Sequence, residues 1–88
     1  MKTKYKHIFF VKNEEISQMI SHDGRQYHQL WSCYNEIGRI VGYVIWYQYV
    51  RQYCIATTNN PVLSSDYLKE FDEFLEQLNK EIEQHESK

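Results

Sequence analysis

The sequence has little of what most chemical sites require. Its 88 residues include only three glycines, two cysteines and one proline. The glycines are too few and too scattered for a phosphate-binding loop, which needs several of them within a short segment. No apolar run approaches the ~20 residues of a membrane-spanning helix, and no signal peptide is recognisable. We therefore expect no membrane association and a reducing, cytoplasmic location.

Cysteine and histidine are also poorly arranged for catalysis or metal binding. A metal site needs three or four convergent ligands, whereas Cys33 and Cys54 stand far apart and belong to no Cys-x-x-Cys pair. The four histidines are scattered at His7, His22, His28 and His85. Both cysteines lie in apolar segments, where a thiol behaves as a small buried side chain. We predict no catalytic residue, no metal and no cofactor; a Cys33–Cys54 disulfide is an alternative if their strands are neighbours.

Charge is unevenly distributed, although the formal net charge is only −2. Residues 1–60 carry seven Lys or Arg against four acidic residues, a net +3, and residues 61–88 carry three against eight, a net −5. The second segment predicts an acidic helix, whose ordinary role is to face solvent. Its alternative role is to bind a basic groove, and the candidate residues are Asp66, Glu70, Glu73 and Glu76.

Aromatic and β-branched residues are abundant between residues 39 and 57, and both types favour pleated, half-buried strands. We predict four strands, at residues 5–11, 27–34, 39–48 and 51–57. In the third of these, alternation places two sets of side chains on opposite sides. The sets are Ile40, Gly42, Val44 and Trp46, and Val41, Tyr43, Ile45 and Tyr47. Neither side is polar, so one face should pack on helices while the other keeps exposed aromatic residues.

A short helix is predicted over residues 14–22. Asn13 is a suitable N-cap, and Ile16 and Ile20 have helical spacing. The competing interpretation is a hairpin, because the Asp-Gly pair at residues 23–24 is a strong turn signal.

The C-terminal helix is the clearest element in the sequence. Ser64 is a suitable N-cap, and Leu63 and Leu68 are spaced to form a hydrophobic staple. An apolar stripe follows with helical spacing, flanked by Phe74, and consists of Leu68, Phe71, Leu75, Leu78 and Ile82. The pattern predicts a helix of about 20 residues that covers one face of the sheet.

These elements predict one α+β domain over residues 1–88. Its centre is a three-stranded antiparallel β-meander packed on the long C-terminal helix, with an N-terminal strand and a short helix before it. We expect residues 1–4 and 84–88 to fray.

Part of the chain also carries a recognisable pattern. A glycine-led strand ends in paired aromatics at residues 42–47, and an Arg-Gln-Tyr strand starts at Arg51. A serine-containing helix start at Ser64 and a Phe-Leu-x-x-Leu-Asn segment from Phe74 to Asn79 follow. From residue 31 to 79 the chain resembles a group of short uncharacterised proteins encoded by bacteriophages and prophages. The resemblance implies a mobile-element origin in a bacterial host cell and the meander-plus-helix fold, but it implies no activity.

Protein binding is the function that these residues favour, because Tyr, Trp and Arg are enriched at interface positions that dominate affinity. The candidate residues on the sheet are Tyr43, Tyr47, Arg51 and Tyr53, and those on the helix are the four acidic residues above. Because phage proteins of this size often act by obstructing another protein, we expect a small phage accessory protein that inhibits a host or anti-phage defence factor. A homodimer through the helix or the sheet edge is a further expectation.

The alternative function is binding of single-stranded nucleic acid by the same aromatic sheet residues. Residues 39–46 partly resemble the central strand of RNA-recognition domains, in which aromatic rings stack on bases. Double-stranded-RNA-binding domains place a lysine cluster at the start of the last helix, but here Lys69 stands among acidic residues. A third interpretation is that the aromatic residues simply fill the core.

Overall fold

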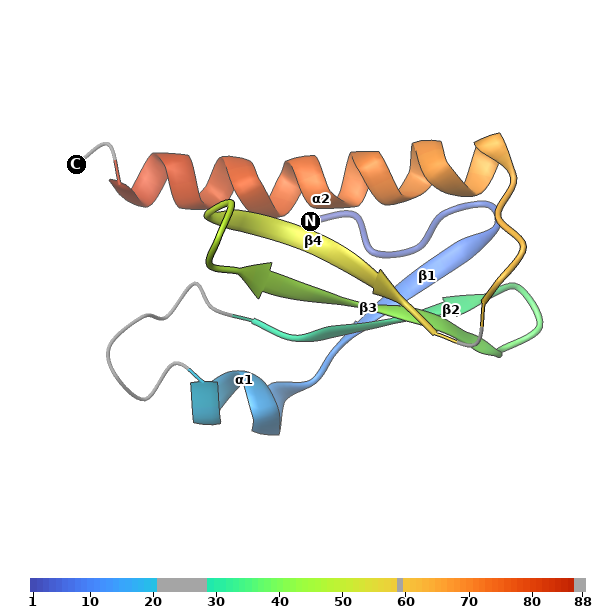
Figure 1. The fold of residues 1–88 in the computed structure, drawn as a ribbon, viewed down its shortest axis with the longest axis horizontal. Helices are drawn as coiled ribbons and strands as arrows, with labels where there is room; N and C mark the ends of the chain where they lie inside the picture. Colours follow the sequence, from blue (N-terminus) through green and yellow to red (C-terminus); the bar gives the residue numbers. More distant parts are fainter. Residues whose placement is uncertain (21–28, 59, 87–88) are drawn as a thin grey trace.

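The computed structural model describes residues 1–20, 29–58 and 60–86 and confirms a mixed α+β fold (Figure 1). Four strands form one antiparallel sheet in the order β1-β2-β3-β4. They are β1 (Ile8–Lys12), β2 (Trp31–Asn35), β3 (Ile40–Tyr47) and β4 (Gln52–Thr57). The helices are α1 (Glu14–Ile20) and α2 (Ser65–Glu86). The predicted meander is therefore present, and the N-terminal strand extends it beside β2.

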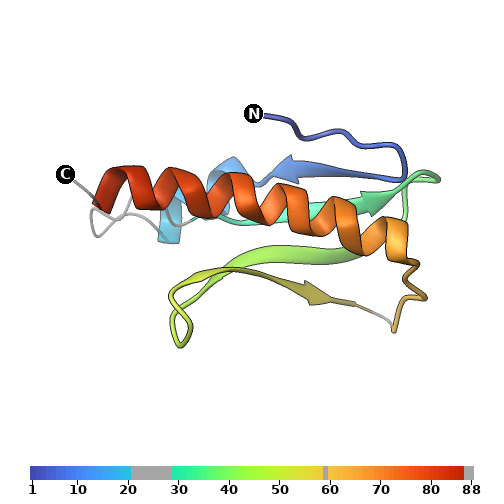
Figure 2. The ribbon, with the colours of Figure 1, turned by 90° about the horizontal axis from the view of Figure 1, so that it is seen from above.

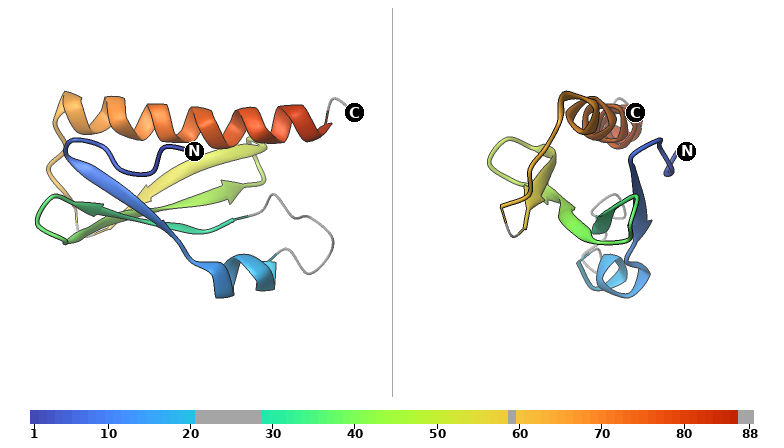
Figure 3. Two further views of the ribbon diagram at one scale, coloured as in Figure 1. Left: turned by 180° about the vertical axis from the view of Figure 1, so that it is seen from behind. Right: turned by 90° about the vertical axis from the view of Figure 1, so that its right-hand side faces the viewer.

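The two helices lie on opposite sides of the sheet. α2 runs along the whole of one face, and α1 lies beyond the other face at one end (Figure 1). Seen along its length, the sheet curves so that β1 and β4 rise on either side of α2 (Figure 3). One long helix thus serves as the main cover for a four-stranded sheet.

The core lies between α2 and the face of the sheet that curves around it. Phe74 is completely buried, with its ring stacked 3.8 Å from that of Phe10 and edge-on to Trp31 at 5.0 Å. Phe71 and Leu78 are buried one turn to either side of Phe74. The predicted stripe is confirmed at Phe71 and Leu78, but it is wrong in placing Phe74 at its flank. The apolar side of α2 is centred on Phe74, because the helix presents the positions three and four residues from it to the sheet.

The start of α2 confirms one predicted signal and corrects another. The hydroxyl of Ser64 accepts a hydrogen bond from the N–H of Tyr67 at 3.2 Å, as expected of an N-cap. Leu63 packs against the core, but Leu68 is 53% exposed. Leu68 therefore contributes little to the core at this end of the helix.

The short helix α1 is confirmed over the described residues 14–20, and the hairpin interpretation is wrong there. Asn13 caps it, since its side-chain oxygen accepts a hydrogen bond from the N–H of Ile16 at 2.8 Å. Asn13 also donates its own N–H to the carbonyl of Leu30, and the buried Ser17 hydroxyl accepts from the N–H of Leu30. These bonds fix α1 to the start of β2. Residues 21–28, with the Asp-Gly pair, lie outside the described residues.

Strand β1 begins later than predicted because the chain before it folds back. Lys4 forms an isolated bridge with Phe9, and the carbonyl of Thr3 accepts a hydrogen bond from the N–H of Phe10 at 2.8 Å. The expected fraying of residues 1–4 is therefore not what the structure shows at Thr3 and Lys4. This segment lies along the outer side of β1 (Figure 2).

Two turns set the register of the sheet. Between β2 and β3, Asn35 accepts hydrogen bonds from Ile37 and Arg39, and Gly38 adopts a φ of 85°. Between β3 and β4, the N–H of Arg51 bonds to the carbonyl of Tyr47, and Arg51 has a φ of 54°. Tyr47 pairs with Gln52, so the loop between them has four residues. This loop length sets the register and therefore determines which side chains of β4 face α2.

An irregularity next to Tyr34 alters one expected face of β3. Cys33 pairs with Gly42, whereas Tyr34 pairs with Ile40, so Val41 is an additional residue in β3. Val41 is buried in the core, so the prediction that it shares one side of the strand with Tyr43, Ile45 and Tyr47 is wrong.

The two cysteines are free and do not form the alternative disulfide. Cys33 is completely buried and lies in the core cluster. Cys54 lies in β4, which is separated from β2 by β3, and pairs with Ile45. The two strands are not neighbours, so the condition for the disulfide is not met.

Gly42 is required by the close approach of β4. A Cβ atom at this position would lie 2.7 Å from the carbonyl oxygen of Ala56. We expect Gly42→Ala to lower the free energy of unfolding by about 1–3 kcal/mol, because backbone atoms must shift to admit the methyl group. Urea unfolding followed by circular dichroism measures the change.

The matched control is Gly38→Asn, since nothing lies within 4 Å of a Cβ there and asparagine tolerates a positive φ. We expect it to change stability by less than about 1 kcal/mol. A Gly42→Ala protein as stable as the wild type would contradict the close approach of the two strands.

Candidate functional site

The face of the sheet turned away from α2 is the main candidate surface. We call it the open face. By register and alternation its members are Phe9, Val11, Ser32, Tyr34, Tyr43, Ile45, Tyr47, Gln52, Cys54 and Ala56. None of these residues is Asp, Glu, Lys, Arg or His. Val11 is 48% exposed and Tyr47 45% exposed, so the apolar character of this face is accessible to a partner.

Aromatic rings are distributed across the open face. Phe9 and Tyr34 stack at a centroid distance of 5.3 Å on the neighbouring strands β1 and β2. Tyr43 is half-buried, and Tyr47 lies 5.5 Å from the ring of Tyr49 in the following loop. A shallow apolar depression next to Tyr47 is lined by β3 and β4. The rings and this depression together form a broad aromatic surface.

Tyr53 does not belong to the open face, and its predicted position is wrong. It pairs with Trp46, lies edge-on to it at 5.5 Å and is only 3% exposed. Its hydroxyl accepts a hydrogen bond from the N–H of Gln29 at 3.0 Å. The register set by the four-residue loop turns the odd-numbered residues of β4 toward α2 and the even-numbered ones toward the open face. Tyr53 is therefore a core residue.

Arg51 lies in the loop between β3 and β4 rather than in a strand. It is exposed, with a left-handed backbone conformation. Of the four sheet residues predicted as a site, Tyr43 and Tyr47 share one face, Arg51 is at the adjoining hairpin tip, and Tyr53 is on the other side. The structure brings together only the first three.

The four predicted acidic residues of α2 fall into two groups by their exposure to solvent. Asp66, Glu73 and Glu76 are exposed, whereas the side chain of Glu70 is only 13% exposed. Glu73 lies 3.9 Å from the ammonium group of Lys2, and both groups are largely exposed, so this ion pair contributes little to stability. Three of the four residues are therefore available to a partner.

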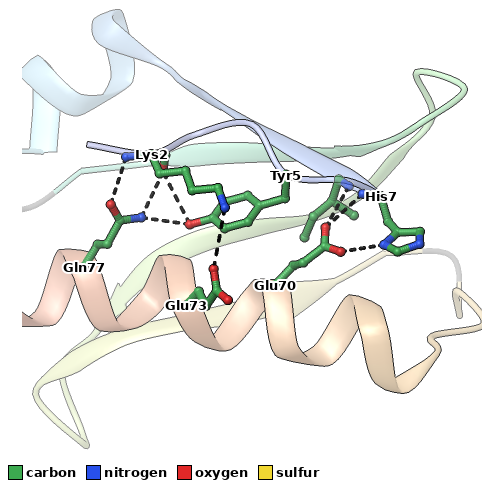
Figure 4. A network of polar contacts seen from close by, with 7 residues as sticks. Lys2, Tyr5, His7, Glu70, Glu73 and Gln77 are labelled. Carbon is green, nitrogen blue, oxygen red and sulfur yellow. Dashed lines mark hydrogen bonds and ion pairs between the residues drawn. The ribbon is translucent and has the colours of Figure 1, made fainter.

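Glu70 instead holds the N-terminal segment against α2 (Figure 4). One carboxylate oxygen accepts hydrogen bonds from the N–H groups of His7 at 3.0 Å and Ile8 at 3.2 Å. The other lies 2.5 Å from Nδ1 of the His7 ring. Burial on its own would raise the pKa of the Glu70 carboxyl, but the hydrogen bonds and charge of His7, with the bond from Ile8, lower that pKa below its ordinary value of 4.5. Glu70 is therefore a structural residue.

The same segment makes a second set of contacts with α2 (Figure 4). The side chain of Gln77 accepts a hydrogen bond from the N–H of Lys2 at 2.8 Å and donates to the carbonyl of Lys2 at 2.9 Å. It also donates to the hydroxyl of Tyr5 at 2.8 Å. Sequence reasoning missed these contacts. Their partners lie more than 60 residues apart in the chain, and no spacing rule connects them.

The potential metal ligands among the described residues do not converge, and the Cys33 thiol is buried. Among the described residues, no three His, Cys, Asp or Glu side chains are grouped so that they could hold a metal ion. Burial, with a smaller contribution from the charge of Glu70, raises the pKa of Cys33 to about 12. This thiol is therefore protonated at neutral pH and does not act as a nucleophile. No helix within the described ranges is both long and apolar enough to cross a bilayer.

Comparison of the chain with protein-family models, with curated proteins and with solved structures gave no match. Function must therefore be argued from the surfaces described above.

The Glu70 contacts predict a pH-dependent contribution to stability. A carboxylate whose pKa is lowered on folding stabilises the protein above its unfolded-state pKa, and this stabilisation is lost as the pH falls through the folded-state value. We expect Glu70→Gln to lower the free energy of unfolding by about 1–2 kcal/mol at pH 7. We expect the difference from the wild type to shrink below a pH of about 4.5.

Urea unfolding at pH 7 and at pH 3.5 measures both values. Glu73→Gln, three residues away and exposed, is the control and should have little effect at either pH. A Glu70→Gln effect of equal size at both pH values would show that the charge of Glu70 does not hold the N-terminal segment.

Proposed function

We propose that this protein is a non-enzymatic binding module that recognises another protein through the open face. The observation that carries this proposal is an uncharged, aromatic face of the sheet left uncovered over Val11 and Tyr47. Exposed apolar surfaces of this kind typically mark sites of association with proteins.

The chemistry of the rings supports a protein partner. Tyrosine provides a large contact area at a low cost in conformational entropy, and its hydroxyl satisfies polar groups of the partner. Tyr43, Tyr47 and the stacked Phe9–Tyr34 pair supply such area from three strands held in one sheet. A rigid sheet presents these side chains without the ordering cost of a flexible loop.

Single-stranded nucleic acid is the less favoured ligand for the open face. Stacking on aromatic rings would suit bases, but affinity for a phosphate backbone depends on nearby Lys and Arg. The strand positions of the open face carry neither, and the exposed Arg39 and Arg51 lie in the turns that flank β3. Acidic residues dominate the exposed side of α2, on the opposite side of the sheet.

The resemblance to short phage and prophage proteins supports a more specific role. A phage origin, which that resemblance implies, would make the partner a host or anti-phage defence protein inside the bacterial cell, and binding would inhibit it. The open face supplies the contact, and Asp66, Glu73 and Glu76 form a second exposed surface that suits a basic partner.

Variants of the open face test the proposal directly. We expect the double variant Val11→Ser and Tyr47→Ser to lose most of its partner in affinity capture from host lysate, because both side chains are about half exposed and contribute apolar contact. Quantitative mass spectrometry of the recovered proteins measures the loss, which should be about tenfold or more. Circular dichroism confirms that the variant is folded.

The control is the double variant Val62→Ser and Leu68→Ser. These side chains are 95% and 53% exposed and lie outside the open face. Equal recovery of every partner by both variants would contradict the proposal.

In parallel, fluorescence anisotropy with a 20-nucleotide single-stranded DNA at low salt tests the alternative. If the protein binds this DNA and the Tyr47→Ser variant does not, the ligand of the open face is nucleic acid and not a protein.

A further inference from the structure

A second surface lies on the other side of the molecule, between the edge strand β4 and α2. A groove of about 590 Å³ runs there, lined by residues 52–55 of β4 and by one side of α2. β4 ends the sheet on this side, and no described strand pairs with its outer edge (Figure 2). The groove therefore lies between the outer edge of β4 and α2.

The outer edge of β4 offers hydrogen-bonding groups to such a strand. The N–H of Thr58 donates a hydrogen bond to the carbonyl of Val41 in β3. By alternation, the backbone N–H and C=O groups of the even-numbered residues of β4 point toward β3, and those of the odd-numbered residues point outward. The N–H of Tyr53 confirms this direction, since it donates to the side-chain oxygen of Asn79 on α2 at 2.8 Å. Ile55 and Thr57 therefore direct their N–H and C=O groups to the free edge.

The sequence of β4 contains none of the residues that normally prevent strand addition. β4 has the sequence Gln-Tyr-Cys-Ile-Ala-Thr, without charge or proline. Natural edge strands are usually protected by lysine, proline, a bulge or a covering element. Among the described residues, Asn79 covers the N–H of Tyr53, at one end of the edge.

The α2 side of the groove defines the charge of the occupant. Asp72, Glu76 and Lys80 are exposed, line the groove and follow one another at four-residue intervals. Four residues of helix advance about 6 Å, and two residues of a strand advance about 6.7 Å. Three alternate side chains of an added strand would therefore lie opposite these three charges. Complementarity requires two basic side chains followed by an acidic one.

We propose that this groove binds an extended peptide segment of another protein, which pairs antiparallel with β4 as a fifth strand and presents basic, basic and acidic side chains at alternate positions. α2 runs antiparallel to β4, with Asn79 beside Tyr53, so the peptide runs in the same direction as α2. The basic residues then meet Asp72 and Glu76, and the acidic residue meets Lys80.

A second copy of this chain is a poor occupant of the groove. The side chains that its β4 would turn toward α2 are Tyr53, Ile55 and Thr57, which carry no charge to pair with Asp72 or Glu76. The groove shares Gln52 and Cys54 with the rim of the open face, but its charged side is formed by α2, so the site stands whether or not the open face binds a protein.

The test uses a fluorescein-labelled peptide of threonine, lysine, valine, lysine, valine, glutamate and threonine, in that order. We expect saturable binding by fluorescence anisotropy and shifts of the Ile55 and Thr57 amide signals in NMR spectra. Methylation of the backbone nitrogens of both lysines should abolish binding, because these N–H groups face β4. Methylation of both valine nitrogens, which face away, should leave binding within about twofold.

Variants of the protein test the charge pattern. Glu76→Lys should weaken binding of the peptide about tenfold, whereas Glu81→Lys, on the same helix but outside the groove, should change it less than about twofold. The Tyr47→Ser variant should bind the peptide as the wild type does, which separates this site from the open face.

Several results would overturn the proposal. They are an absence of amide shifts at Ile55 and Thr57, equal weakening by the two methylated peptides, and unchanged binding by Glu76→Lys. Tighter binding of the peptide in reverse order would contradict the antiparallel arrangement. A dimeric mass in light scattering, with Ile55 amide shifts that depend on protein concentration alone, would assign the groove to a second copy of the chain.

Discussion

The stacking of Phe74 on Phe10, edge-on to Trp31, is the contact on which the arrangement of this protein depends. It holds the long helix α2 to one face of the sheet at a completely buried point. Burial of a phenylalanine side chain contributes about 1.5–3 kcal/mol, and its replacement by alanine in a core typically costs about 3–5 kcal/mol. Phe71 and Leu78 are buried on the same side of α2, so the position of the helix is set by these side chains together with the three rings.

Once α2 occupies one face, the free surfaces of the molecule follow. A single long helix covers the concave side of the sheet, and the short α1 lies at one end of the other side (Figure 1). The open face therefore keeps Tyr47 and Val11 exposed. The curvature that closes the core also brings the edge of β4 beside the acidic flank of α2, where the groove lies. The same packing thus generates an apolar surface and a charged groove that are chemically distinct.

Local signals in the sequence predicted the elements well. Asn13 and Ser64 cap the helices as their side chains suggested, and the meander followed from aromatic and β-branched residues. The faces were harder to predict. The four-residue loop before Gln52 turned Tyr53 inward, and the irregularity beside Tyr34 buried Val41. Glu70 resembled any exposed acidic helix residue, because its bonds to His7 and Ile8 join segments far apart in sequence. Half of the sheet candidates, Tyr43 and Tyr47, could be placed on the open face from alternation alone.

The exposure of individual tyrosines tests this account most directly. Hydroxyl-radical footprinting of the monomeric protein, with the modified residues identified by mass spectrometry, reports the solvent access of each ring. The account predicts that Tyr47 is modified much faster than Tyr53 and Tyr5, since Tyr47 is 45% exposed and the other two are buried. A Tyr47 ring as protected as that of Tyr53 in the monomer would show that the second face of the sheet is covered, and the open face would not exist.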